Sequence, residues 1–147
     1  MKRILVVMIL SCLMLSSFVY GEEQIVDSTV IEMIVQEVEL TNERIDYYID
    51  VHIDYSEVVL ESYNEEIEFL NENFSAKTKQ HFIQIASEKK DDLIDQIIDS
   101  LIAITNAEAE RMFERAESFG VPVICDYILV TIDQNEVQID PIRVVGG

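Results

Sequence analysis

Between Arg44 and Val59 the chain reads RIDYYIDVHIDYSEVV, in which apolar and polar positions alternate. Every second residue from Ile45 to Tyr55 is apolar or aromatic, whereas three of the five intervening positions are aspartates. A period of two is typical of a strand with one buried face, and Ile, Val and Tyr favour strands. The aspartates also recur at every fourth position, as they would on a helix. We predict a strand over residues 45–55, with a helix as the alternative.

After this segment the apolar period becomes helical. Apolar residues are spaced by four, four, three and four positions, which predicts one buried helical face made of Val59, Tyr63, Ile67, Leu70 and Phe74. Ser56 suits the N-cap, so the predicted helix covers residues 57–73. Upstream, residues 34–40 also alternate and are followed by LTNER, which can turn the chain. Residues 34–40 and 44–55 are therefore expected to pair as a β-hairpin.

A longer amphipathic segment follows, from Thr78 to Glu117. Ser75 suits its N-cap, and Gly120 with Pro122 predicts its end. At 1.5 Å per residue it would extend for about 60 Å, more than twice the length of the first helix. Two arrangements would account for the part of this helix that extends beyond the first one. Either the helix breaks at TNAE, where Thr105 and Glu108 can form a capping box, or its stripe packs on a second copy of the protein.

Residues 121–145 predict a second β-hairpin. Folding the segment around Gln134 and Asn135 places Ile132 opposite Val137 and Val130 opposite Ile139. One face of this hairpin is then apolar and the other polar, so the apolar face must be covered by another element.

Together these elements predict an α+β fold of order β-β-α-α-β-β, a four-stranded antiparallel sheet with a helical hairpin packed on one face. The alternative is a mostly α fold, a long helical hairpin with a C-terminal β-hairpin. The sequence has no internal repeat and no Gly/Ser linker, so we expect a single domain over residues 22–147.

The N-terminus has the layout of a cleavable secretory signal. Lys2 and Arg3 precede an apolar run, and a stretch of small and turn-forming residues follows it. We predict a signal peptide over residues 1–21 with cleavage after Gly21, and therefore a secreted or periplasmic protein. The alternative is that the segment is retained as an N-terminal membrane anchor.

Charge limits the classes of partner. The whole chain carries −19, and without Lys2 and Arg3 the remaining 8 basic and 29 acidic residues give −21. Such a charge repels nucleic acid and anionic lipid, so neither is expected as a partner. A protein partner or a second copy of the chain is expected instead.

Candidate chemistry is sparse. Cys125 is the one cysteine after the predicted signal, so no intramolecular disulfide is expected, and its apolar neighbours predict a buried thiol. If residues 45–55 are extended, Asp50, His52 and Asp54 share a face with neighbours about 6.6 Å apart. That set of ligands suits Zn²⁺ or Mn²⁺, although a solvated polar face is the commoner outcome for such residues. On a helix, His52 would leave the group.

The sequence contains no nucleophile elbow, no HExxH, no CxxC and no Gly-rich phosphate loop. We therefore expect a non-enzymatic, exported interaction or binding domain without a cofactor. The alternatives are a divalent-metal-binding or metal-dependent hydrolytic protein that uses Asp50, His52 and Asp54, and a structural subunit of an extracellular assembly.

Overall fold

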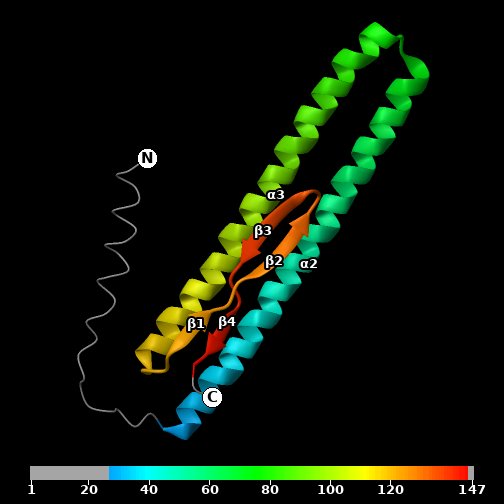
Figure 1. Cartoon of the computed structure of the whole chain (residues 1–147). Coiled ribbons are helices and arrows are strands. Elements are labelled where there is room, and N and C mark those ends of the chain that lie inside the picture. The colour runs from blue at the N-terminus through cyan, green and yellow to red at the C-terminus, as the bar shows by residue number, and fades with distance from the viewer. Residues whose placement is uncertain (1–26, 146–147) are drawn as a thin grey trace, which may run out of the picture.

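The computed structural model describes residues 27–145, a long helical hairpin with a short β-ribbon on one of its faces (Figure 1). The predicted signal peptide, residues 1–21, lies outside the described residues. In chain order the elements are α2 (Ser28–Asn73), α3 (Ala76–Ser118), β1 (Val123–Cys125), β2 (Ile128–Ile132), β3 (Asn135–Ile139) and β4 (Ile142–Val144).

The predicted strand over 45–55 is wrong, because these residues form the middle of helix α2. The alternation that suggested a strand comes from two helical stripes, each with a spacing of four and offset from the other by two residues. Ile45 and Ile49 belong to the stripe that enters the core, and Tyr47, Val51 and Tyr55 belong to an exposed stripe. Two stripes on one helix therefore produce a period of two.

The predicted hairpin of residues 34–40 with 44–55 and the helix start at Ser56 are wrong for the same reason. Helix α2 begins much earlier, at Asp27, whose side chain accepts a hydrogen bond from the Thr29 N–H at 2.9 Å. The LTNER segment continues the helix, and Asn42 within it has a separate role described below.

Two hydroxyl residues that suggested helix caps lie instead inside continuous helices. Ser56 donates to the Ile53 carbonyl at 2.7 Å, and Thr105 donates to the Leu101 carbonyl at 2.8 Å. Both are buried. A hydroxyl that bonds a carbonyl of the preceding turn needs no helix terminus, and α3 is continuous through Thr105 and Glu108, so the first of the two arrangements that would account for its length, a break at TNAE, is wrong.

The ends of α3 agree with the prediction. Ser75 occupies the N-cap, and its carbonyl accepts from the Lys79 N–H at 2.9 Å. At the other end Gly120 has a φ of 69°, and the Val121 N–H reaches back to the Ala116 carbonyl at 3.0 Å. A glycine in the left-handed region, followed by an N–H that donates to the carbonyl five positions earlier, is a common way for a helix to end.

The length of α3 is covered by α2, because the two helices have nearly equal lengths of 43 and 46 residues. Their contacts keep a constant register. Glu37 contacts Arg115, Arg44 contacts Glu108, and His52 contacts Ser100, so that each step along α2 matches an equal step back along α3.

The C-terminal residues form one interrupted β-hairpin. β2 pairs with β3 and β1 pairs with β4, both antiparallel, and the two ladders have the same register. Between them the Asp126 N–H donates to the Pro141 carbonyl at 2.9 Å. The predicted turn at Gln134 and Asn135 is wrong by one position. The observed loop is Asp133 and Gln134, and Asp133 adopts a positive φ of 54°, which Asp tolerates.

The β-hairpin turns over where the ladders are interrupted. Val123 and Val130 both pack toward the helices although an odd number of positions separates them, and the same holds for Ile139 and Ile142. Alternate residues of a strand face opposite sides, so an odd separation requires the ribbon to rotate between them. The hairpin therefore has two inward faces, one for each half.

Each half of the hairpin covers its own core cluster. β2 and β3 pack on Ile45, Ile49, Ile94 and Leu101, and β4 packs with Ile34, Val38, Met112 and Ala116. Asn42 joins the second half to α2, because its amide donates to the Ile142 carbonyl at 2.8 Å and accepts from the Ile142 N–H at 2.9 Å. The Asn42 amide thus makes the two backbone hydrogen bonds that a neighbouring strand would otherwise make with Ile142.

The predicted four-stranded sheet is wrong, since the strands form two two-stranded sheets. The structure has the alternative architecture, a long helical hairpin with a C-terminal β-hairpin (Figure 1). The physical reason is that the two predicted N-terminal strands are part of α2. Within residues 27–145 no helix combines the length and the apolar character needed to cross a membrane.

The hairpin covers only part of the helices. Lys90 marks the boundary, because its ammonium contacts the Asp133 carboxylate in the hairpin turn at 3.1 Å and lies 5.9 Å from the Tyr63 ring centroid. We call residues 62–90 the arm and the remaining described residues the body. Beyond the Lys90 contact the two helices of the arm extend past the hairpin and, among the described residues, pack only on each other (Figure 1).

Candidate functional site

Helix α2 has a second apolar face that no element of the described chain covers. Its six exposed large apolar side chains follow helical spacing, and their relative exposures range from 41% to 64%. At 100° per residue they fall within a sector of about 80° on the helix, well separated from the core face. We call this set the outer stripe: Leu40, Tyr47, Val51, Tyr55, Val58 and Phe69.

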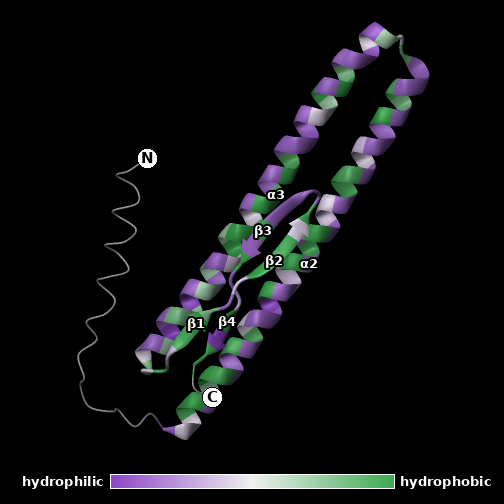
Figure 2. Cartoon of the chain, viewed as in Figure 1, coloured by the Kyte–Doolittle hydropathy of each residue, from purple (hydrophilic) through white to green (hydrophobic). Residues whose placement is uncertain are grey.

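The outer stripe lies on the face of the helical hairpin away from the β-hairpin. Asn42 bonds β4, whereas Arg44 bonds Glu108 across the other side of α2. Asn42 and Arg44 are two positions apart, which is a rotation of about 200° around the helix axis, so their contacts point to nearly opposite sides. Leu40 is one turn from Arg44 and lies on the same side. Figure 2 shows apolar and polar residues alternating along α2 on both body and arm.

One margin of the outer stripe is acidic along its whole length. Helix α2 contains no Lys or Arg after Arg44. The carboxylates of this margin are all exposed and lie within about 80° of one another on the helix. We call them the acidic margin: Glu43, Asp50, Asp54, Glu57, Glu61, Glu65, Glu68 and Glu72.

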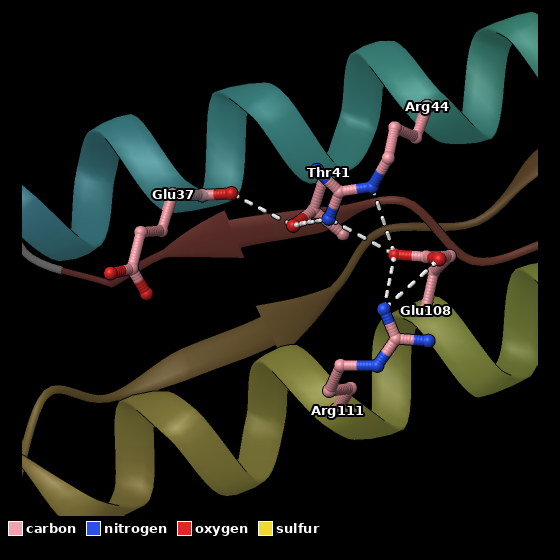
Figure 3. A network of polar contacts seen from close by, with 5 residues as sticks. All are labelled: Glu37, Thr41, Arg44, Glu108 and Arg111. Atoms are coloured by element: carbon pink, nitrogen blue, oxygen red, sulfur yellow. Dashed lines mark hydrogen bonds and ion pairs between the residues drawn. The ribbon is translucent and has the colours of Figure 1, made fainter.

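A polar network joins α2 to α3 at the body end of this face (Figure 3). Glu108 is buried, and its carboxylate accepts from Arg44 at 3.0 Å and from Arg111 at 3.2 Å. Arg44 also donates to the Thr41 hydroxyl at 3.0 Å, and Thr41 in turn donates to the Glu37 carbonyl at 2.8 Å. The buried carboxylate is thus compensated by two guanidinium groups, which a buried charge requires.

Arg115 completes the network with two hydrogen bonds to Glu37, at 3.0 and 3.2 Å. These hydrogen bonds and the Arg115 charge lower the pKa of Glu37 against the opposing effect of burial. Three guanidinium groups and two carboxylates therefore surround a hollow of about 300 Å³, which Leu40 of the outer stripe also lines. The network is close to neutral and most of its donors are engaged.

Two further hollows continue along the same face. One of about 150 Å³ is lined by His52, Tyr55, Leu93 and Ser100, and the next, of about 180 Å³, is lined by Tyr55, Val58, Leu93 and Lys89. Tyr55 and Leu93 belong to both, so the hollows adjoin. The outer stripe therefore borders a shallow groove between α2 and α3, which begins at the arginine network and extends into the arm.

The helix separates the residues of the predicted metal site. Asp50 and Asp54 are exposed on the acidic margin, one turn apart. His52 lies on the other side, where its Nδ1 is 2.7 Å from the Tyr48 carbonyl and its Nε2 is 3.3 Å from the Ser100 hydroxyl. Within residues 27–145 no three His, Cys, Asp or Glu side chains are placed to hold a metal ion. Cation binding by the chain stays a prediction, which calorimetry with Zn²⁺ and Mn²⁺ tests.

The predicted burial of Cys125 is wrong. Its thiol is free and exposed, because Cys125 follows the inward-facing Val123 by two residues at the point where the ribbon rotates. Partial desolvation, with the nearby Asp140 charge, raises the pKa of this thiol. The thiolate needed for nucleophilic chemistry is therefore disfavoured at neutral pH.

The spacing of the outer stripe is present in the sequence, although the alternation over residues 45–55 predicts a strand there. Tyr47, Val51, Tyr55 and Val58 have the spacing of four, four and three that is typical of a helix packed on another helix. The contacts of Arg44 and Arg115 could not be predicted, because pairs that are 64 and 78 positions apart leave no local pattern. Arg111 lies only three positions from Glu108, and this helical spacing is a signal that the sequence does contain.

The groove thus combines a long apolar stripe, an acidic margin and a nearly neutral arginine network at one end. The exposed apolar stripe and the charged groups beside it are of the kind that recognise another molecule. The chain matches no protein-family model, no curated protein and no solved structure.

Proposed function

We propose that this protein is an exported, non-enzymatic interaction domain and that the outer stripe of α2 is its protein-binding surface. The single observation that supports this function is the exposure of six large apolar side chains on one face of a helix whose other face is already in the core. Isolated exposed apolar residues are ordinary, but a row of them along one face of a helix is typical of an interface.

The dimensions of the stripe suit a helical partner. From Leu40 to Phe69 it extends for about 44 Å, or eight turns of helix. A helix lying along it would bury the stripe together with the groove beside α3. With helices about 10 Å wide, the strip covered on α2 alone is about 440 Å², about half of the 800 Å² or so per partner of a standard protein interface. The groove beside α3 adds to this area, so the surface has the size of a small interface.

The stripe also has the side chains that interfaces favour. Tyr47, Tyr55 and Phe69 supply large apolar area with few rotatable bonds, and aromatic residues are enriched at the centres of interfaces. The adjoining groove provides hollows on the α3 side for a partner's side chains. The net negative charge of the exterior favours solubility of the unbound domain, in which this apolar surface is exposed to water.

The test uses residues 22–147 with the paired substitution Val51→Asp and Val58→Asp. Self-association is measured by sedimentation, and binding is measured with labelled amphipathic helical peptides of opposite flanking charge. We expect the parent protein to show at least one of these associations and the paired variant to lose it, because two carboxylates would be buried without partners.

The matched control is Leu129→Asp. Leu129 is as exposed as the stripe residues, at 62%, but it lies on the outer face of the β-hairpin. It is expected to retain whatever association the parent shows. If the parent protein neither self-associates nor binds any of the peptides, the proposed function is wrong.

A further inference from the structure

We infer that the partner on the outer stripe is a cationic amphipathic helix of another protein, with an apolar stripe flanked on both sides by Lys or Arg. This inference rests on the proposed function and adds the chemical class of the partner. It is supported by the distribution of charge around the groove, which favours one class of occupant and disfavours a second copy of this chain.

The α2 side of the groove attracts cations. The eight carboxylates of the acidic margin are exposed along Glu43–Glu72, and no basic residue of α2 after Arg44 offsets them. A helix placed on the outer stripe would hold one row of its flanking side chains over this margin. Lysine or arginine in that row would gain several ion pairs, whereas acidic residues would repel.

The outer side of α3 is acidic as well. Asp92, Asp99, Glu110 and Glu114 are exposed there and are spaced by helical intervals. At the body end of the groove Arg44, Arg111 and Arg115 are already bonded to Glu108 and Glu37. At the arm end Lys90 is paired with Asp91 and Asp133, and Lys89 lines the hollow beside Glu66. The groove thus has acidic outer sides and a floor whose positive groups are mostly paired.

This arrangement disfavours a second copy as the occupant. Two copies that met through the same face would place acidic margins near one another, and each mature chain carries −21. Like charges held close at an interface are costly, and long-range repulsion slows the encounter. A cationic helix instead gains at both sides of the groove and approaches an oppositely charged surface.

The experiment uses two synthetic peptides of 28 residues or so, which span about 42 Å as helices. Both have Leu at the a and d positions of each heptad. One has Lys at the e and g positions, and its twin has Glu there. Fluorescence anisotropy with residues 22–147 is expected to show at least about tenfold tighter binding of the Lys peptide, with the advantage shrinking as salt is added.

Two protein variants distinguish recognition from simple attraction. The triple substitution Asp50→Asn, Asp54→Asn and Glu61→Gln should weaken binding of the Lys peptide several-fold and reduce its salt dependence. The control Glu136→Gln removes an exposed carboxylate on the outer face of the β-hairpin and should leave binding unchanged. All four positions are exposed, so folding is not at risk.

A third peptide has the composition of the Lys peptide in an order without an apolar stripe. Equal binding of this scrambled peptide would overturn the inference, because charge alone would then explain the affinity. Equal binding of the Lys and Glu peptides through Val51 and Val58 would also overturn it, while leaving the proposed interaction function intact. Self-association lost in the Val51→Asp and Val58→Asp variant, without peptide binding, would identify a second copy as the occupant and overturn it as well.

Discussion

The body and the arm contain the same two helices, but they differ in what those helices bury. In the body α2 and α3 pack on each other and on the β-hairpin, and nearly all of the buried apolar residues lie there. In the arm only Leu70 and Ala86 are buried, while Phe69, Phe74, Phe82 and Ile85 remain between 38% and 58% exposed. The aromatic rings at the tip, from Phe69 to Phe74 and Phe82, pack mainly on one another.

The difference shows what the β-hairpin contributes. Two helices in contact bury one stripe each, which leaves little apolar area away from water, whereas a third element encloses side chains on a second side. The hairpin would be marginal alone, and the helices give it a surface to cover. Stability is therefore expected to be concentrated in the body, and the arm to open locally at lower free energy.

The largest expected effect is on the core. Leu101→Ala removes a fully buried side chain between α2 and the hairpin and should lower the free energy of unfolding by about 2–5 kcal/mol. Leu70→Ala in the arm should cost roughly 1–2 kcal/mol, because fewer neighbours surround the cavity. Urea unfolding followed by circular dichroism measures both, and equal losses would contradict the proposed division.

A smaller effect separates two asparagines. Asn42→Ala leaves both backbone groups of the buried Ile142 without their partner, which should cost about 1–3 kcal/mol. Asn73→Ala removes a hydrogen bond of the same length, 2.8 Å, to the Phe69 carbonyl at the exposed end of the arm. It should cost no more than about 0.5 kcal/mol. Thermal melts of the two variants compare their losses of stability. A larger loss for Asn73→Ala than for Asn42→Ala would contradict this prediction.

The smallest effect depends on pH and concerns the Glu37 and Arg115 pair of the body. Because hydrogen bonding to Arg115 lowers the pKa of Glu37 in the folded protein, the ionised carboxylate favours folding at pH above its ordinary value of 4.5. That contribution is lost as the pH falls through the lower, folded-state value. Glu37→Gln should therefore be slightly less stable than the parent at neutral pH, with the difference vanishing in acid.

Urea unfolding of the parent and Glu37→Gln at several pH values from neutral to acid measures this dependence. The effect is expected to be small because the pair is largely exposed and solvent screens it. In an Arg115→Gln background the Glu37→Gln substitution should show no such pH dependence. A difference that persists unchanged there would show that another group is responsible.

Most of the architecture could be predicted after residue 56, but not before it. From Val59 to Leu70 a single apolar stripe gave an unambiguous helical period. Over Ile45–Tyr55 the core stripe and the outer stripe are both complete, so apolar residues occupy every second position and imitate a strand. The aspartates at every fourth position and the absence of Gly and Pro favour a helix over that stretch, but the alternation and the β-branched and aromatic content favour a strand.

The β-hairpin illustrates a different limit. The predicted register was displaced by two residues, yet it assigned Val130, Ile132, Val137 and Ile139 to the correct face, because a shift of two preserves the side on which each side chain lies. The rotation near Pro141 could not be predicted, since it depends on the two core clusters that the hairpin must cover. The prediction that Cys125 is buried is wrong for the same reason.

The candidate site was predictable only in part. The spacing of Tyr47, Val51 and Tyr55 is a property of the sequence, but their exposure follows from where α3 and the hairpin lie. The predicted grouping of Asp50, His52 and Asp54 assumed a strand, and a turn of about 200° between His52 and each aspartate removes that geometry.

The matched register of α2 and α3 has a consequence for how the length of this molecule can vary. Since equal steps along the two helices stay level, seven residues inserted in each at matching positions of the arm would move the tip outward by about 10 Å. The rotation added by each heptad is only about 20°, so the apolar faces would remain almost in line. The arm is in this sense a spacer of adjustable reach, whose length can change in whole heptads while the β-covered end stays as it is.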